Sequence, residues 1–209
     1  MIAIVDYGVG NLYSLTCSLS RVGAECVVTR NEQALRDADR LILPGVGAFG
    51  DAADKLRALG LDALLAEQAK LGKPLLGICL GMQILFDESD EYGEHRGLGL
   101  ISGAVRPLAQ ALGTGAKVPH MGWNSLHIVK PNDPLLAGAR EGDFVYYVHS
   151  YYATGCEVSL VATSEYGGAT VPGLVRAGNV CGAQFHPEKS GEIGLRMLAN
   201  FAKGGDATC

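Results

Sequence analysis

The chain has 209 residues, 48% of them hydrophobic, and a formal net charge of −5 at pH 7. That length suits one α/β domain with a full core, and no apolar run approaches the roughly 18 residues that a membrane-spanning helix needs. Acidic and basic residues are interspersed without a Lys/Arg cluster, which argues against nucleic acid as a ligand.

The chain begins with a strand-like segment, Ile2–Val5, and lacks the basic region that opens a signal peptide. We therefore expect a cytoplasmic protein with reduced thiols and no membrane partner. None of the six cysteines forms a C-x-x-C pair, and their spacing suggests neither a zinc site nor a disulfide framework. We expect no metal ion and no cofactor. The apolar neighbours of three cysteines indicate core positions for Cys17, Cys26 and Cys181.

The first half of the chain alternates between strand-like and helix-like segments. The expected strands are Ile2–Val5, Cys26–Thr29, Arg40–Leu43 and Leu75–Ile78, and the expected helices cover 10–23, a short stretch through Ala34, 51–70, and the residues from Leu80 onward. This β-α-β-α order predicts a parallel sheet with helices on both faces.

The pattern changes at about Gly97 to short β segments separated by Gly and Pro, and a last helix is expected at 191–201. No linker, repeat or low-complexity tract divides the chain. We therefore predict a single domain covering residues 1–209, in which a mainly parallel sheet is extended by an antiparallel or mixed portion.

One cysteine lies between two glycines where a strand gives way to a helix, in the segment GICLG at 77–81. The form G-x-Nuc-x-G is that of a nucleophile elbow, in which a sharp turn holds the nucleophile in a strained conformation. Side chains two residues away would collide, so Gly77 and Gly81 are needed there. The free N–H groups at the start of the helix favour a thiolate at Cys79, the reactive form. We interpret Cys79 as a nucleophile rather than as a small residue at a tight turn.

A cysteine nucleophile of this kind needs a base, and the base needs an orienting group. Among the five histidines, His186 is the best candidate, because a strand ends just before it and would present it beside Cys79. Glu188 follows two residues later, and alternation in an extended segment would point both side chains the same way. His120 and His149 follow β-like runs and stay possible as bases.

An acyl intermediate also needs hydrogen-bond donors for its oxyanion. The N–H of Leu80 is one candidate, and the glycine-rich loop PGVGAFG can supply a second. Gly45, Gly47 and Gly50 in that loop also satisfy the dinucleotide pattern G-x-G-x-x-G. However, the loop follows the third expected strand rather than the first, and no acid ends the next strand. We therefore do not expect a nucleotide site.

Several motifs together resemble one family. GICLGMQ with a distant FHPE is typical of the class I, triad-type glutamine amidotransferases, and the chain also contains DYGVGNL, PGVGAFG, PHMGWN, YYVHSYY and FHPEKS. These motifs are spread over essentially the whole chain. The resemblance implies the family's flavodoxin-like three-layer α/β fold.

The resemblance also implies a Cys–His–Glu triad that hydrolyses L-glutamine. Cys79 would attack the side-chain amide to give a thioester and ammonia, His186 would transfer protons, and Glu188 would orient His186. Four residues would bind glutamine, two of them through their backbone: Gln83, Glu91, Ser150 and Tyr151. The peptide Gly45–Val46–Gly47 would donate to the oxyanion only after it rearranges, so a lone subunit should be slow.

PHMGWN beside YYVHSYY points to one branch of the family, in histidine biosynthesis, whose members form a heterodimer with a separate (β/α)8-barrel cyclase. Ammonia must cross to the cyclase without meeting bulk water, which calls for an apolar, aromatic docking surface. The aromatic candidates, for which core packing is the alternative, are Trp123, Tyr146, Tyr147, Tyr151 and Tyr152. The resemblance adds Asn11, Asn124 and Lys189 as interface residues.

Two other functions stay open. A paralogous glutaminase subunit could supply ammonia for sugar amidation in surface-polysaccharide synthesis. A catalytically silent flavodoxin-like binding module is a third reading, which fits poorly because all three triad residues are present.

One departure from the family pattern is HPEKSG in place of HPEKSQ. Gly191 puts any glutamine-mediated contact at that position in doubt.

Overall fold

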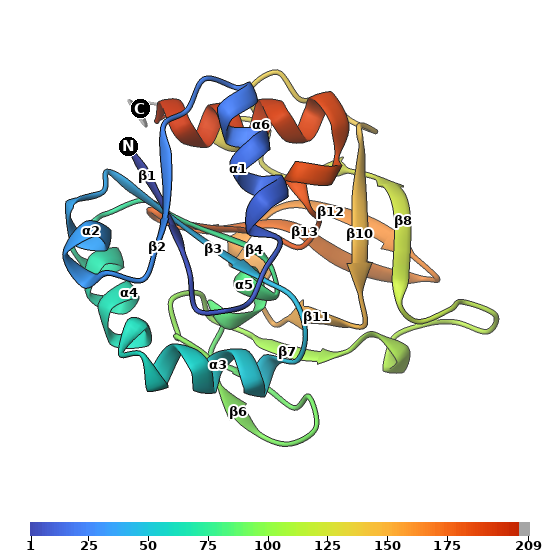
Figure 1. The fold of residues 1–209 in the computed structure, drawn as a ribbon. Helices are drawn as coiled ribbons and strands as arrows, with labels where there is room; N and C mark the ends of the chain where they lie inside the picture. The colour runs from blue at the N-terminus through green and yellow to red at the C-terminus, as the bar shows by residue number, and fades with distance from the viewer. Residues whose placement is uncertain (205–209) are drawn as a thin grey trace.

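The large sheet combines a parallel half with an antiparallel half (Figure 1). The computed structural model describes residues 1–204, so residues 205–209 of the expected domain lie outside the described part. The parallel strands lie in the order β2 (Cys26–Thr29), β1 (Ile2–Val5), β3 (Arg40–Gly45), β4 (Leu75–Cys79) and β14 (Val180–Ala183). The antiparallel strands β13 (Ala169–Ala177), β12 (Leu160–Tyr166) and β9 (His127–Ile128) continue the sheet. The expected sheet is confirmed.

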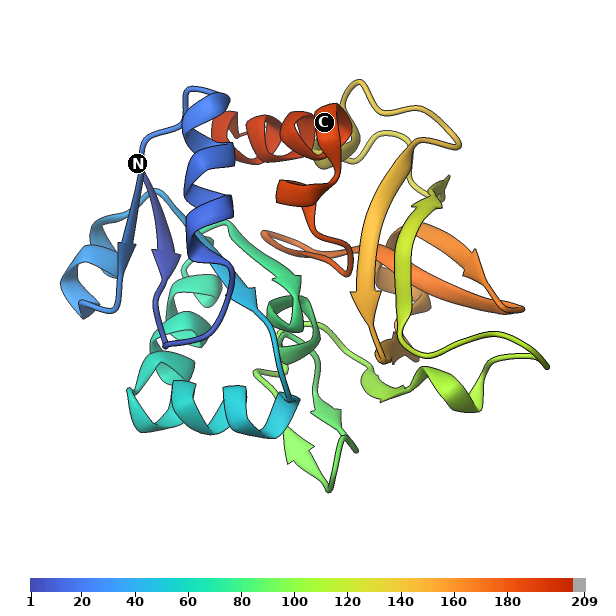
Figure 2. The ribbon, with the colours of Figure 1, turned by 45° about the vertical axis from the view of Figure 1, so that its right-hand side comes forward.

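Helices cover both faces of this sheet (Figures 1 and 2). One face carries α1 (Leu12–Arg21) and α6 (Gly191–Lys203), and the other carries α2 (Glu32–Asp37), α3 (Phe49–Ala58), α4 (Leu61–Lys70) and α5 (Leu80–Ile84). Side chains alternate along β1, where Ile2 and Ile4 pack with α1 and α6 while Ala3 and Val5 pack on the opposite face. The three-layer prediction and the last helix are therefore confirmed.

The expected helix at 51–70 is wrong, because the segment forms two helices, α3 and α4, that meet at Gly60. Gly60 has a φ of +67° and donates its N–H to the carbonyl of Arg57 at 2.9 Å. Only glycine adopts this left-handed conformation without strain, and it is a common end to a helix. The apolar periodicity continues across Gly60, so the sequence pattern does not reveal the break between the two helices.

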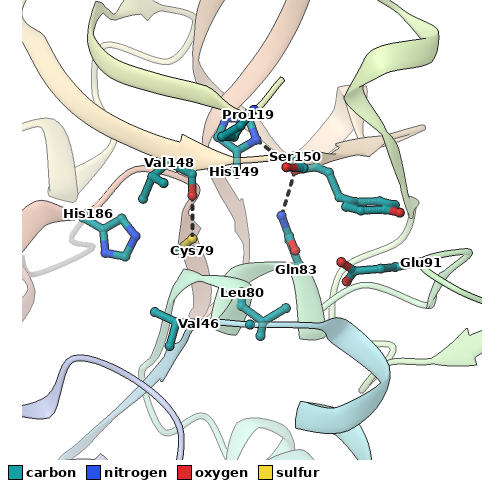
Figure 3. A pocket seen from close by; sticks show the side chains of 12 residues that line it. Val46, Cys79, Leu80, Gln83, Glu91, Pro119, Val148, His149, Ser150 and His186 are labelled. Atoms are coloured by element: carbon teal, nitrogen blue, oxygen red, sulfur yellow. Dashed lines mark hydrogen bonds between the residues drawn. The ribbon is translucent and has the colours of Figure 1, made fainter. Parts of the chain in front are cut away.

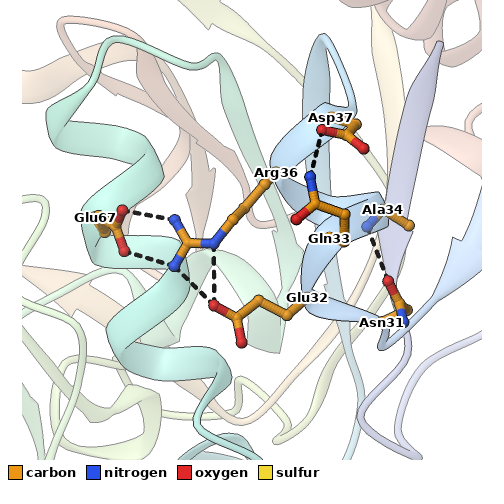
Figure 4. A network of polar contacts seen from close by, with 7 residues as sticks. All are labelled: Asn31, Glu32, Gln33, Ala34, Arg36, Asp37 and Glu67. Atoms are coloured by element: carbon orange, nitrogen blue, oxygen red, sulfur yellow. Dashed lines mark hydrogen bonds and ion pairs between the residues drawn. The ribbon is translucent and has the colours of Figure 1, made fainter.

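An ion-pair network joins α2 to α4 (Figure 4). Arg36 donates two parallel hydrogen bonds to the carboxylate of Glu67, at 2.6 and 2.8 Å, and contacts Glu32 one turn earlier on its own helix. The side-chain oxygen of Asn31 accepts from the N–H of Ala34 and so caps the start of α2. These contacts orient a helix that is too short to be stable alone.

Two smaller sheets lie beside the carboxyl end of β4. One is the four-stranded sheet β11 (Tyr151–Thr154), β7 (Ala104–Pro107), β5 (Glu88–Ser89) and β6 (His95–Arg96). The other is an antiparallel ribbon of β8 (His120–Ser125) and β10 (Phe144–His149), visible at the right of Figure 1. Short 3₁₀ turns occur at 108–110, 134–136, 157–159 and 187–189.

The cysteines expected in the core differ in exposure. Cys181 is buried and Cys26 is half-buried, but Cys17 is exposed. The expectation for Cys17 is wrong because the buried side of α1 is formed by Leu15, Ser18 and Leu19. Among residues 1–204, no helix combines the length and the apolar character needed to cross a membrane.

Candidate active site

Cys79 is the last residue of β4 and sits on a strained strand-to-helix turn. Its φ of 54° and ψ of −111° lie outside the regions that a residue with a side chain usually adopts. A Cβ added to Gly81 would lie 1.8 Å from the carbonyl oxygen of Leu43, and one added to Gly77 would lie 2.6 Å from that of Gly81. The glycines at this turn are therefore obligatory, and the predicted elbow geometry is confirmed.

The thiol of Cys79 is buried at the wall of a crevice. Its Sγ lies 3.8 Å from the carbonyl oxygen of Val148 on β10 (Figure 3). The same sulfur lies 3.9 Å from Nε2 of Gln184. The neighbouring parallel strand β14 pairs with β4 in register, Ala183 opposite Ile78. The chain that leaves β14 therefore passes directly beside the sulfur and carries His186 to it.

His186 and Glu188 form a buried hydrogen-bonded pair. Nδ1 of His186 lies 2.8 Å from Oε1 of Glu188, and both side chains are 3% exposed. The predicted contact is confirmed, but the predicted reason is wrong, because Pro187–Lys189 forms a 3₁₀ turn rather than an extended segment. The turn folds the carboxylate back toward the ring, and Pro187 at its first position presets the backbone angle.

The second ring nitrogen of His186, Nε2, is not used by Glu188. Nε2 is buried and has no hydrogen-bond partner among residues 1–204, and the ring lines the same cavity as Cys79 (Figure 3). Burial alone lowers the pKa of His186, but its contacts with Cys79 and Glu188 outweigh burial and raise the pKa to about 9. An imidazolium at neutral pH stabilises a thiolate next to it and holds a proton ready for a leaving group.

A cavity of about 360 Å³ opens in front of the sulfur. Its lining includes Cys79, His186 and seven other residues predicted for the site, namely Val46, Gly47, Leu80, Gln83, Glu91, Ser150 and Tyr151. Sequence reasoning missed Pro119 and Val148, which also line the cavity, because an apolar residue in a β segment carries no chemical signal.

Gln83 holds the wall of this cavity. Its Nε2 donates to the carbonyl of Tyr151 at 2.8 Å and to Oε1 of Gln184 at 3.0 Å. Both amide hydrogens are therefore committed to the protein, and Gln83 ties α5 to β11. Only its amide oxygen is left to accept a hydrogen bond from a ligand.

Glu91 joins the cavity to the start of α3. Its Oε2 accepts from the N–H of Phe49 at 2.7 Å and supplies the cap that Ala48 cannot provide. Burial raises the pKa of Glu91, while the bond from Phe49 acts in the opposite direction. A carboxylate in this wall can pair with an ammonium group of a ligand.

The loop after β3 has one fixed end and one free end. Gly45 is wedged under the elbow, since a Cβ there would lie 2.6 Å from the backbone nitrogen of Gly81. The hydroxyl of Tyr7, which sequence reasoning missed, donates to the carbonyl of Pro44 at 2.7 Å. By contrast, Val46 is 43% exposed and Gly47, at a φ of +97°, has open space around it. The peptide between Val46 and Gly47 can therefore turn without moving the elbow.

The two other histidines near the crevice pair with each other. Nδ1 of His120 lies 2.9 Å from Nε2 of His149. Burial lowers the pKa of His120 to about 4, and burial is also the main reason that the pKa of His149 falls to about 3. Both rings are therefore neutral at pH 7, and in the described part of the chain neither bonds to a carboxylate. Of the three candidate bases, only His186 has the orienting group that a base needs.

The residues predicted for a docking surface divide into two groups. Trp123 is 55% exposed on the β8–β10 ribbon, its ring lies 6.0 Å from that of Tyr146, and Nζ of Lys189 lies 5.9 Å from the Tyr146 ring. Tyr151 and Tyr152 are half-buried.

Three other predicted interface residues face inward or cap a helix. Tyr147 is fully buried, so its assignment to the surface is wrong; on β10 it alternates with the outward-facing Tyr146. The amide of Asn124 turns inward to Nε2 of His120 and the carbonyl of Glu165. Asn11 caps α1 through the N–H of Ser14.

A family model describes nearly the whole chain. Residues 3–204 match the model for "Glutamine amidotransferase class-I". Among residues 1–204, no group of three or more His, Cys, Asp or Glu is arranged to hold a metal ion.

Bacterial relatives are similar over nearly their full lengths. A protein of Bacillus cytotoxicus, "Imidazole glycerol phosphate synthase subunit HisH", is 53% identical over 201 residues, which are 96% of this chain and 93% of that protein. Proteins with the same name from Geobacillus sp. and Oceanobacillus iheyensis are 51% and 46% identical, over 97% and 96% of this chain and 96% and 98% of theirs.

Solved structures with low sequence identity share the fold. A crystal structure of a glutamine amidotransferase superposes with a TM-score of 0.74 at 22% identity, covering 97% of this chain and 100% of that one. The structure of PurLQS from Thermotoga maritima gives 0.72 at 21% identity, covering 97% of each.

Proposed function

The chain belongs to the class-I glutamine amidotransferase family, and on that premise we propose that it is the glutaminase subunit of an imidazole glycerol phosphate synthase. It hydrolyses L-glutamine to glutamate and ammonia and passes the ammonia to a cyclase subunit that forms imidazole glycerol phosphate and AICAR. The observation that carries the proposal is the buried pairing of His186 with Glu188 beside the strained thiol of Cys79. The relatives' shared name supports this pathway over sugar amidation.

In the first half-reaction Cys79 acts as the nucleophile. Its thiolate attacks the side-chain carbonyl carbon of glutamine and forms a carbon–sulfur bond. The imidazolium of His186 gives its proton to the amide nitrogen, the carbon–nitrogen bond breaks, and ammonia leaves. The pKa of about 9 at His186 supports this role, since the ring is protonated before the substrate arrives.

In the second half-reaction the thioester is hydrolysed. The neutral ring of His186 takes a proton from water, and the hydroxide attacks the thioester carbon. The carbon–sulfur bond breaks, glutamate leaves, and Cys79 and His186 return to the thiolate and the imidazolium. Glu188 holds the ring by its Nδ1–H throughout both steps, so that Nε2 faces the reacting atoms.

Oxyanion stabilisation requires two donors. The N–H of Leu80 follows the nucleophile directly, as in other elbows. The second donor is an N–H of the Gly45–Val46–Gly47 segment after the peptide at its free end turns. A single donor of this kind contributes about 100- to 1,000-fold in rate. The open space around Gly47 supports a loop that turns when the partner docks.

The cyclase partner docks on the outer face of the β8–β10 ribbon, and we take it to be a (β/α)8 barrel. Trp123 and Tyr146 supply an aromatic patch there, and Lys189 adds a charge beside it. Aromatic anchors of this kind carry much of the affinity at protein interfaces. His186 is bonded to the same ribbon, since its N–H donates to the carbonyl of Tyr146 at 2.9 Å. A partner that contacts Tyr146 is therefore separated from the catalytic His186 by one backbone hydrogen bond.

The test is a glutaminase assay of the purified chain, alone and with a histidine-pathway cyclase and that cyclase's nucleotide ligand. We expect slow hydrolysis alone and a large acceleration with the liganded cyclase. Cys79→Ala should remove hydrolysis in both conditions. Full activity of the lone chain, or no response to the cyclase, would contradict the proposal.

A further inference from the structure

Two buried histidines and one half-buried asparagine connect the docking ribbon to the glutamine-binding strand through one line of hydrogen bonds. Nδ2 of Asn124 lies 3.3 Å from Nε2 of His120, Nδ1 of His120 lies 2.9 Å from Nε2 of His149, and Nδ1 of His149 lies 2.9 Å from the carbonyl oxygen of Tyr151. The line begins on β8, crosses to β10 and ends on β11. Neither histidine is assigned a role in the glutaminase steps above.

Only one placement of hydrogens satisfies every contact in this line. The carbonyl of Tyr151 can only accept, so His149 carries its hydrogen on Nδ1 and its Nε2 must accept. His120 therefore donates from Nδ1, and its Nε2 accepts from Asn124. The amide of Asn124 cannot be reversed, because its oxygen already accepts from the N–H of Ser125 at 2.8 Å. The line has a fixed direction and needs both rings neutral.

The rings are also held in place by packing. His120 is 2% exposed and lies between two tyrosine rings, 4.5 Å from Tyr147 and 4.0 Å from Tyr166, with an interplanar angle of 21° to each. His149 is 6% exposed. A ring clamped on both faces cannot rotate to offer a different nitrogen, so the hydrogen-bond direction is set by the fold.

The far end of the line meets a second donor. The carbonyl of Tyr151 accepts from Gln83 as well as from His149, so both of its acceptor positions are occupied. The carbonyl of Ser150 is occupied too, by the N–H of Leu108 at 2.9 Å. Because both carbonyls are hydrogen-bonded to donors of the protein, the backbone of these two residues is held in one orientation.

We propose that His120 and His149 are positioning residues, which fix the Ser150–Tyr151 backbone for glutamine and tie that backbone to the docking ribbon at Asn124. The proposal rests on the glutaminase function proposed above. In this arrangement the inner face of the β8–β10 ribbon supports the substrate site, and the outer face of the same ribbon receives the partner. Neither ring exchanges a proton during turnover, since each is already committed at both nitrogens.

Substitutions at His149 separate positioning from general packing. The side-chain nitrogen of His149→Asn occupies the place of Nδ1 and can still donate to Tyr151, whereas His149→Leu cannot. His149→Leu removes one of the two donors to the Tyr151 carbonyl and leaves the Nδ1–H of His120 without its acceptor, and a lost buried partner of this kind corresponds to about tenfold in affinity. We expect KM for glutamine to rise about tenfold in His149→Leu with kcat nearly unchanged, and less than about threefold in His149→Asn. The exposed His127→Asn serves as the control, with unchanged KM.

Nitrogen NMR of the histidine rings in the wild-type chain gives a second readout that needs no turnover. Both His120 and His149 should be neutral rings with hydrogen on Nδ1 at pH 7.5. A hydrogen on Nε2, or an imidazolium at either position, would overturn the proposal even if His149→Leu fails to fold. An unchanged KM in folded His149→Leu would overturn it as well. An inactive wild type would instead refute the glutaminase function and leave the NMR test standing.

Discussion

Two buried histidines line the same crevice, and their pKa values are shifted in opposite directions. His186 pairs with a carboxylate, and its pKa rises to about 9. His149 pairs with another histidine, and its pKa falls to about 3. Burial lowers the pKa in both cases, so burial does not explain the difference. The partner decides which histidine is charged: Glu188 and the sulfur of Cys79 stabilise a proton, whereas His120 offers a hydrogen bond without a negative charge.

The comparison separates two tasks that the same residue type performs. A ring with a carboxylate on one nitrogen and a free second nitrogen can transfer protons. A ring with both nitrogens committed can only hold its neighbours. The crevice thus has a reactive side, formed by Cys79 and His186, and a rigid side, formed by His149.

The sharpest way to break this comparison is to remove the reactive groups one at a time. We expect Cys79→Ala and His186→Asn each to lower kcat by about 10,000-fold or more, because nucleophile and base act as one unit. His149→Asn should leave kcat nearly unchanged. Steady-state glutaminase kinetics in the presence of the cyclase measure all three. A loss in His149→Asn as large as that in His186→Asn would erase the distinction.

A second change weakens the reactive side without removing its base. Glu188→Gln keeps a hydrogen-bond partner but removes the charge, and we expect kcat to fall about 100-fold or more. The leaving nitrogen needs the imidazolium, so activity should be lost as pH rises through the pKa of about 9 at His186. Because Glu188 helps to raise that pKa, the loss should begin at lower pH in Glu188→Gln. Overlapping alkaline limbs in the pH profiles of kcat/KM would count against this assignment.

The rigid side predicts how stability responds to acid. The pKa values of His120 and His149 are about 4 and 3 in the folded chain and about 6.5 in the unfolded chain, so the unfolded chain binds about 1.8 more protons at pH 5. The stabilising contribution of these two groups is present above pH 6.5 and is lost as pH falls, at about 2.5 kcal/mol per pH unit near pH 5. The raised pKa of His186 acts oppositely: its contribution is present below pH 6.5 and lost as pH rises through about 9.

Denaturant unfolding at several pH values measures this slope. His149→Asn should reduce the slope near pH 5 by about 1.4 kcal/mol per pH unit, because it removes one of the two protons. His127→Asn is the control, since His127 is exposed on β9. Equal slopes in the wild type and His149→Asn would show that His149 is charged in the folded chain.

The smallest expected effect is that of a substitution on the outer face of the β8–β10 ribbon, opposite the face that carries the histidine line. Trp123 lies on the outer face, away from the histidine line, so Trp123→Ala should weaken cyclase binding about 10- to 100-fold without changing the KM for glutamine. Tyr92→Ala, at a side chain that is 87% exposed in another loop, is the control. Calorimetric titration gives the dissociation constants. Unaltered binding in Trp123→Ala would move the docking surface elsewhere.

The reactive side could be predicted from sequence because its chemistry is local. Gly77, Cys79 and Gly81 lie within one five-residue segment, 77–81, and Glu188 follows His186 by only two positions. The reason for that contact was wrong, since a proline and a strand end do not distinguish an extended segment from a 3₁₀ turn.

The rigid side could not be predicted because its contacts join distant segments. His120 and His149 are both adjacent to β-like runs, and only the pairing of β8 with β10 places them opposite each other. The break at Gly60 and the burial of Tyr147 also depend on tertiary packing, which periodicity does not encode. The hydroxyl of Tyr7 gave no signal, because its partner is a backbone carbonyl.

The most direct test is the intact mass of the chain after rapid acid quenching during turnover of glutamine with the liganded cyclase. A thioester mechanism predicts one added glutamyl group, located on Cys79 by peptide mapping and missing in Cys79→Ala. Turnover without this adduct at any quench time, or an adduct on another residue, would contradict the assignment of the reactive side.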